Sequence, residues 1–318
     1  MRLPAWLRWA WWPALAAGLL AFPVLGAHER VLYFVTYLLI WGIFAIAFDM
    51  VFGMAGLLSV GHALFLAFGG YATGWLTVNA GISFIPSLLI ASAGSAILAI
   101  LFGFVALRLS GIFFALTTLA LGQLAMIASD TVLVPVTGGQ DGFSGIPRPD
   151  FFGIDFFQAD NFLVFVAVAF MATLAISALI RVSPFGQVLI AIRTNEVRAS
   201  QLGFNVKYFK IGVLMISGFF AALAGGLMSS LLFFLNSSIL HWSVSGDVVI
   251  MALMGGSGTL LGPVLGAVVF ETLKEMLGEF TGHWHGIMGV LFILFVILLP
   301  DGLAGLCRRV WSRLGKRA

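Results

Sequence analysis

The chain contains several long apolar stretches that hold no charged residue, and these constrain its fold more than any other feature. Four of the clearest span residues 31–48, 161–180, 211–235 and 286–299. A helix needs about 20 apolar residues to cross a bilayer, and it satisfies its own backbone hydrogen bonds in lipid. The stretches are continuous and do not alternate, which excludes a transmembrane β-barrel. We therefore expect an all-α, polytopic transmembrane helical bundle, with residues 1–318 forming a single membrane-spanning domain.

The distribution of positive charge predicts the orientation of this bundle. Arg2 and Arg8 flank the first apolar segment, so we expect an uncleaved span with a cytoplasmic N-terminus. If successive loops lie on alternate sides of the membrane, 13 of the 16 Lys and Arg residues lie in the cytoplasm. The C-terminus is then cytoplasmic too, and the basic pI of about 9.3 reflects orientation and not a nucleic-acid partner. The apolar segments are residues 9–27, 31–53, 54–78, 83–107, 111–134, 161–181, 211–235, 247–275 and 284–300.

Two of these segments are rich in glycine. Residues 53–74 read GMAGLLSVGHALFLAFGGYATG, and the middle of 247–275 reads LMGGSGTLLGPVLGA. A single crossing at 247–275 would place the basic tail outside, so we expect a broken or re-entrant element there, entering and leaving on the outer side. That gives about eight full spans plus Gly-rich broken or re-entrant elements. Whether each element is re-entrant or kinked stays open, and close helix packing is the alternative role of the glycines.

Broken helices in transporters point to the substrate path, and polar groups at membrane depth tend to face the bundle interior. Ser59 and His62 lie one helical turn apart in the first Gly-rich element; for His62 the alternative is a hydrogen bond to a neighbouring helix. Thr117 and Thr118 are weaker candidates, since threonine often bonds back to its own helix. The complete set of predicted path residues is Ser59, Gly61, His62, Thr117, Thr118, Gly255, Gly256 and Gly258.

Catalytic and metal-binding patterns do not stand out. His283 and His285, with Glu279, have poor spacing for a shared metal site. The chain has no G-x-x-x-x-G-K-[ST] phosphate loop, because its Gly315-Lys316 pair is followed by arginine. We expect no enzyme activity, no metal and no cofactor bound by this chain. Carboxylates are almost absent from mid-span positions, and Asp49, at the end of the second span, is expected to cap or to snorkel.

Residues 182–210, VSPFGQVLIAIRTNEVRASQLGFNVKYFK, form the most informative segment. It is longer than a connection between two spans needs to be. Ser183-Pro184 predicts a helix start, with a short helix over 185–192. Asn195 predicts the cap of a second helix, and Gly203 its end.

The second helix, Glu196–Leu202, would lie flat at the cytoplasmic surface. It would present Arg193, Glu196 and Arg198 to a protein partner, with Val197 and Leu202 available to fill a groove. The alternative is a basic loop resting on anionic lipid headgroups.

The stretch IRTNEVRASQLGFNVKYFK, followed by ISGFFAALAGGL, resembles the cytoplasmic coupling motif of ABC importer permeases, in the version of the branched-chain amino acid permeases. GMAGLLSVGHALFLAFGGYATG, LRLSGIFFALTTLALGQ, TGGQDGFSGIP, MALMGGSGTLLGPVLGA and PDGLAGL agree in content and order, from about residue 49 to 306. The outer-loop TGGQDG is similar to the longer, LivM-type subunit. Gly70 departs from the alanine that the family often has there, which affects local packing only.

The resemblance implies a permease subunit in the bacterial cytoplasmic (inner) membrane that moves leucine, isoleucine or valine inward. It implies four kinds of partner: membrane lipid, a second homologous permease subunit, an extracytoplasmic solute-binding protein, and two cytoplasmic ABC ATPase subunits that bind ATP and Mg. The residues implied to dock on the ATPase are Arg193, Asn195, Glu196, Arg198, Ala199, Leu202 and Gly203.

Two alternatives remain. A permease of the same family could carry urea or short amides instead. An ion-coupled secondary transporter would also explain broken helices, but it would prefer a buried carboxylate and would leave 182–210 without a role.

Overall fold

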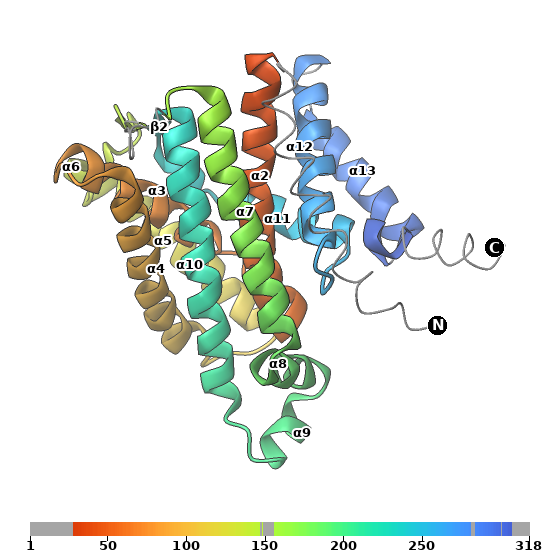
Figure 1. The fold of residues 1–318 in the computed structure, drawn as a ribbon. Helices are drawn as coiled ribbons and strands as arrows, with labels where there is room; N and C mark the ends of the chain where they lie inside the picture. The colour runs from red at the N-terminus through yellow and green to blue at the C-terminus, as the bar shows by residue number, and fades with distance from the viewer. Residues whose placement is uncertain (1–27, 147, 149–155, 281–283, 300, 307–318) are drawn as a thin grey trace.

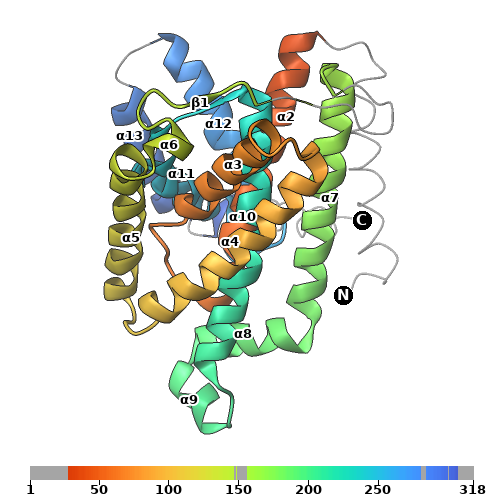
Figure 2. The same ribbon diagram turned by 90° about the vertical axis from the view of Figure 1, so that its left-hand side faces the viewer.

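The fold is given by a computed structural model that describes residues 28–146, 148, 156–280, 284–299 and 301–306. These residues form a bundle of helices with one short arm, α8 and α9, projecting beyond it (Figures 1 and 2). We call this the α9 end of the molecule; the opposite end carries α6, β1 and β2. The first predicted segment, 9–27, and the tail beyond residue 306 lie outside the described residues.

Six helical stretches among the described residues are long and apolar enough to cross a membrane. This confirms the all-α, polytopic class. The stretches are α2 (Glu29–Asp49, continued by a π-helical turn over Met50–Met54), α4 (Phe84–Ala106), α5 (Ile112–Thr131), α7 (Ala159–Val182), α10 (Val206–Leu232) and the stretch beginning in α13 (Trp284–Leu298).

The remaining elements are short. They are α3 (Ala63–Val78), α6 (Val134–Thr137), α8 (Pro184–Thr194), α9 (Glu196–Gln201), a 3₁₀ turn (Ser237–Leu240), α11 (Trp242–Gly255) and α12 (Gly262–Phe280). Two two-residue strands, β1 (Phe143–Ser144) and β2 (Phe234–Leu235), pair antiparallel, with Phe143 opposite Leu235.

Helix α10 lies at the centre of the bundle, packed against α3 and α4. Its middle carries small residues, including Ala221, Ala222 and Gly225, all buried. A Cβ at Gly225 would overlap the Leu66 carbonyl of α3, so the small side chains are what allow the two helices to approach this closely. The outer faces of α4 and α5 are exposed and apolar through Ile97, Leu101, Ile112, Phe113, Leu116, Leu124 and Ile127.

Arg148, which lies between β1 and α7 in the sequence, packs against the end of α10. Its guanidinium donates to the carbonyls of Ser230 and Leu231, each at 3.0 Å. It also stacks over the rings of Phe162 and Phe233. Arg148 itself is therefore fixed to the end of α10.

Both Gly-rich segments are broken. After the π-helical turn the chain is irregular up to residue 62, and α3 then has only 16 residues, too few for a full crossing by itself. The segment 247–275 is a hairpin, because α11 and α12 pack side by side and turn at residues 256–261. Its turn lies beside Asp49, whereas Glu279 at the end of α12 lies 3.2 Å from Arg30 at the start of α2. The total of eight full spans stays a prediction.

Candidate functional site

The α8–α9 arm is built from the two predicted helices and their predicted caps. The Ser183 side chain accepts a hydrogen bond from the Gly186 N–H at 3.3 Å, with Pro184 in the first turn of α8. The Asn195 side chain accepts from the Arg198 N–H at 2.9 Å and so starts α9. Gly203 has a φ of +92°, the left-handed conformation that ends such a helix. The caps are local, which is why the sequence alone places them.

The tip of the arm exposes apolar side chains. Val197 is 69% exposed and Leu202 is 73% exposed, and Tyr208 at the start of α10 adds to the same end of the molecule. Ala199 faces inward and is buried. Contiguous exposed apolar groups of this kind mark protein interfaces, and they lie where the bundle meets the cytoplasm in the predicted orientation.

Two charged residues of the arm contact their own chain. Glu196 lies 2.7 Å from Lys210 Nζ, which ties α9 to the start of α10. Arg193 donates to the carbonyl oxygen of Gly53, in the π-helical turn after α2. Arg198 is exposed on α9. The contact between Arg193 and Gly53 could not be predicted from the sequence, because the two residues are 140 positions apart.

Around the first Gly-rich break, three of the predicted path residues are fully buried: Ser59, His62 and Thr118. His62 Nε2 lies 2.9 Å from the Ser217 hydroxyl of α10, which is the hydrogen bond to a neighbouring helix described above as the alternative. The Thr118 hydroxyl accepts from the Val60 N–H at 3.0 Å. The break is thus held between α5 and α10.

The other predicted path residues also lie in packed positions. Gly61 packs against the backbone of Thr118, and Thr117 donates to the Phe113 carbonyl of its own helix at 2.8 Å. Gly255 and Gly256 lie where α11 ends and Gly258 lies in the hairpin turn, where its N–H donates to Asp49 at 2.8 Å. The eight residues therefore form two groups, one at each break, and their role as a path stays a prediction.

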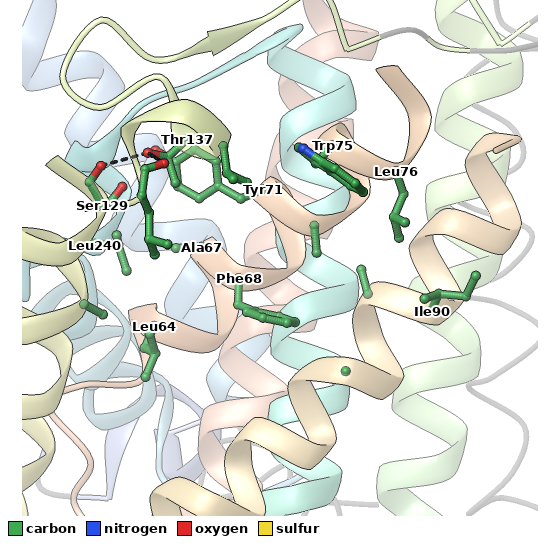
Figure 3. Close-up of a pocket in the computed structure, with 16 residues that line it drawn as sticks. Leu64, Ala67, Phe68, Tyr71, Trp75, Leu76, Ile90, Ser129, Thr137 and Leu240 are labelled. Carbon is green, nitrogen blue, oxygen red and sulfur yellow. Dashed lines mark hydrogen bonds between the residues drawn. The ribbon is translucent and has the colours of Figure 1, made fainter. Parts of the chain in front are cut away.

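A cavity of about 420 Å³ lies between α3, α4, α5 and α6 (Figure 3). Phe68, Trp75 and Ile90 are among its apolar lining residues. Besides the indole N–H of Trp75, its polar side-chain groups are the hydroxyls of Tyr71, Ser129 and Thr137, which Figure 3 shows near one end. Thr137 donates to the Ser129 carbonyl at 2.8 Å, whereas the Tyr71 and Ser129 hydroxyls have no hydrogen-bond partner among the described residues. The volume is in the range of small-ligand pockets.

None of the predicted path residues lines this cavity. Sequence reasoning missed it because a cavity between three apolar helices carries no charge or motif. Tyr71 offers the one signal, as a large polar aromatic residue beside glycines in the first Gly-rich element.

Two carboxylates are more deeply buried than the apolar pattern of the sequence indicates. Asp49 does not snorkel, since it is 3% exposed and bonded to Gly258 and Arg181. Glu271, within α12, is also 3% exposed, so a buried carboxylate is present in a helix that packs against α2. It lies 3.6 Å from Lys274, which in turn lies 3.3 Å from Asp247 of α11.

A metal site finds no support among the described residues, which contain no group of three His, Cys, Asp or Glu that could hold an ion. His283 and the side chain of His285 lie outside that part of the chain.

Comparison with known proteins gives a consistent result. The family model described as "Branched-chain amino acid transport system / permease component" matches residues 30–299. The high-affinity branched-chain amino acid transport system permease protein LivM of Escherichia coli is 28% identical over 86% of this chain and 69% of its own length. LivM of Salmonella typhimurium is 27% identical with the same coverage. The corresponding LivH protein of Escherichia coli is 25% identical over 83% of this chain and 91% of its own length. No solved structure gives a significant match.

Proposed function

The chain belongs to the family of permease components of branched-chain amino acid transport systems, and from that premise we propose that it carries leucine, isoleucine or valine inward in an ABC importer driven by ATP. The observation that carries the proposal is the α8–α9 arm: two capped helices outside the bundle, with an apolar tip on the side where an ATPase would bind. A chain that crossed the membrane without such a partner would have no use for this arm.

The partners follow from the surfaces that the fold leaves exposed. Two ATPase subunits, which hold ATP and Mg, would dock on the arms of two permeases. A second homologous permease would cover part of the apolar face of α4 and α5, in keeping with the likeness of this chain to both LivM and LivH. A solute-binding protein would approach the opposite end, where Arg148 is bonded to the end of α10. Both termini would be cytoplasmic, in the bacterial inner membrane.

The arm is continuous with α7 and α10, and these two helices run the length of the bundle (Figures 1 and 2). Closure of the ATPases would therefore tilt both helices. Since α10 packs on α3 and α4, the tilt would change the shape of the cavity between α3, α4 and α5. This chain contributes no residue to ATP hydrolysis in the proposal.

The lining of the cavity favours a branched aliphatic solute over urea or a short amide. Apart from three hydroxyls and the indole N–H of Trp75, its side chains are apolar, which suits an aliphatic solute side chain. A urea molecule has hydrogen-bonding groups on all sides, and most of them would be left without partners, at a cost of about 1–3 kcal/mol each.

The buried Glu271 supports the alternative function of an ion-coupled secondary transporter, because such a transporter would use a buried carboxylate. Its pairing with Lys274, and the arm, favour the importer. The two functions predict opposite results for the chain studied alone, so one experiment separates them.

The test is affinity purification of the tagged chain in mild detergent, comparing wild type with Leu202→Asp and Val197→Asp. We expect a second permease and Walker-A ATPases with the wild type, and loss of the ATPases from both variants. Val132→Asp is the matched control, because Val132 is 76% exposed but directly follows the C-terminal end of α5, outside the arm. This variant should retain the ATPases. A chain that purifies alone and transports solute alone after reconstitution would refute the importer.

A further inference from the structure

We propose that Asp49, Arg181 and Arg193 form a latch that transmits movement of the α8–α9 arm to both Gly-rich breaks. The inference rests on the proposed function, since it assigns a role in coupling that only an ATP-driven importer needs. We call these three residues, with the backbone of Gly53 and Gly258, the Asp49 latch.

The first half of the latch holds the hairpin turn. Asp49 ends α2, and its Oδ1 accepts the Gly258 N–H at 2.8 Å. Arg181, in the last turn of α7, donates from Nη1 to the Gly258 carbonyl and lies 3.3 Å from Asp49 Oδ2 through Nη2. Both backbone polar groups of Gly258 are thus bound by side chains of other helices. The turn between α11 and α12 is fixed to α2 and α7 together.

The second half holds the break after α2. Arg193, in the last turn of α8, donates from Nη1 to the Gly53 carbonyl. Its aliphatic stem lies over Gly56, where an added Cβ would come 3.0 Å from Arg193 Cγ. A Cβ at Gly258 would come 2.8 Å from Arg193 Nη1. One side chain of the arm therefore lies against both Gly-rich elements at once.

Covalent connectivity explains why such a link is needed. The arm continues directly into α7 and α10 but not into α2, α3 or the hairpin. Movement of α9 reaches those elements only through noncovalent contacts, and Arg193 supplies a charged one. The Arg181–Asp49 ion pair, with side-chain exposures of 21% and 4%, would be costly in a bundle that needed only passive packing at this point.

The three residues could instead only hold the helices together, a role that we call a staple. A staple and a latch that transmits movement predict different results. A staple that is weakened lowers the amount of assembled complex. A latch that is weakened leaves the complex assembled and its ATPase stimulated by the binding protein, but separates hydrolysis from transport. The ratio of solute moved to ATP hydrolysed is therefore the decisive quantity.

The experiment uses the complete importer in proteoliposomes, with leucine as the solute, and measures complex yield, ATP hydrolysis and uptake. For Arg193→Gln we expect normal yield, retained hydrolysis, and uptake per ATP reduced about tenfold, a typical size for coupling between distant sites. Arg193→Lys keeps a donor and should restore part of the ratio. Asp49→Asn, which keeps an acceptor for Gly258 but loses the charge, should also reduce it. Arg108→Gln is the matched control and should behave as wild type, because Arg108 is an exposed arginine in the turn between α4 and α5, outside the arm and the latch.

Each outcome has one meaning. If wild type fails to assemble with ATPases or to take up leucine, the proposed function fails and the latch with it. If wild type transports but Arg193→Gln and Asp49→Asn keep the wild-type ratio, the latch alone is refuted. Loss of assembly in both variants, in proportion to the loss of uptake, identifies a staple and also refutes the latch.

Discussion

The contact between α3 and α10 gives the sharpest prediction for stability, through the substitution Gly225→Ala. Alanine favours a helix over glycine by about 1 kcal/mol, so at a position with free space the change should stabilise. At Gly225 the added Cβ would overlap the carbonyl oxygen and carbon of Leu66 and come 3.0 Å from the Gly70 nitrogen. These are backbone atoms, which cannot rotate away as a side chain can.

The magnitude follows from the balance of these two effects. Overpacking costs roughly 1–3 kcal/mol, and a clash with rigid backbone belongs at the upper end of that range. Subtracting the gain of about 1 kcal/mol in helix propensity leaves a net loss of about 2 kcal/mol. For a chain of 318 residues this corresponds to a lowering of the apparent midpoint by about 3 °C.

The assay is thermal unfolding of the purified chain in detergent, followed by tryptophan fluorescence and by the monodisperse fraction on size exclusion. The matched control is Gly246→Ala in α11, where nothing lies within 4 Å of the added Cβ. This control should have an unchanged or slightly raised midpoint. If Gly225→Ala is as stable as Gly246→Ala, then α3 and α10 are not packed backbone to backbone, and the account of the bundle centre is wrong.

Three further predictions concern the arm, the first break and the cavity. Ser217→Ala leaves His62 Nε2 buried without its partner, so the free energy of unfolding should fall by about 1–3 kcal/mol, and an unchanged thermal midpoint would contradict this. In the Glu196–Lys210 pair the glutamate is half exposed but the lysine is buried; Lys210→Ala should therefore lower the free energy of unfolding by about 0.5–3 kcal/mol through lost packing, whereas Lys210→Glu should weaken ATPase co-purification and the double variant with Glu196→Lys should restore it. Ala91 is buried in the wall of the cavity; Ala91→Phe should lower leucine uptake by about tenfold or more through loss of the pocket, and wild-type uptake would show that solute does not pass there.

The sequence predicts features that depend on neighbouring residues better than features that depend on residues far apart along the chain. The caps at Ser183 and Asn195 are local and were predicted correctly, as were the breaks in both Gly-rich elements. The contact that the Arg193 side chain makes could not be predicted. Its acceptor is a backbone carbonyl 140 residues away, and a carbonyl has no signature in a sequence.

The cavity was missed for a related reason. Its walls come from three helices whose residues are apolar whether they face lipid, a neighbour or an empty space. Hydropathy distinguishes residues that face water from residues that do not. It does not distinguish residues that face lipid, a neighbouring helix or an empty space. The orphan hydroxyls of Tyr71 and Ser129 become informative only when the helices have been placed beside one another.

The breaks and the buried charges at the α9 end explain each other. A straight helix leaves no free backbone groups along its length, and in a membrane every such group must find a partner. The turn at Gly258 exposes both an N–H and a C=O, and the irregular chain after Met54 leaves the Gly53 carbonyl open. A carboxylate and two guanidiniums supply the missing partners, with charge-assisted bonds that are stronger than neutral ones. Because one of those guanidiniums belongs to the arm, satisfying the breaks also connects them to the element that an ATPase would move. The glycines, the buried charges and the arm therefore form one arrangement, in which the flexible parts of the bundle are held by the residues best placed to shift them.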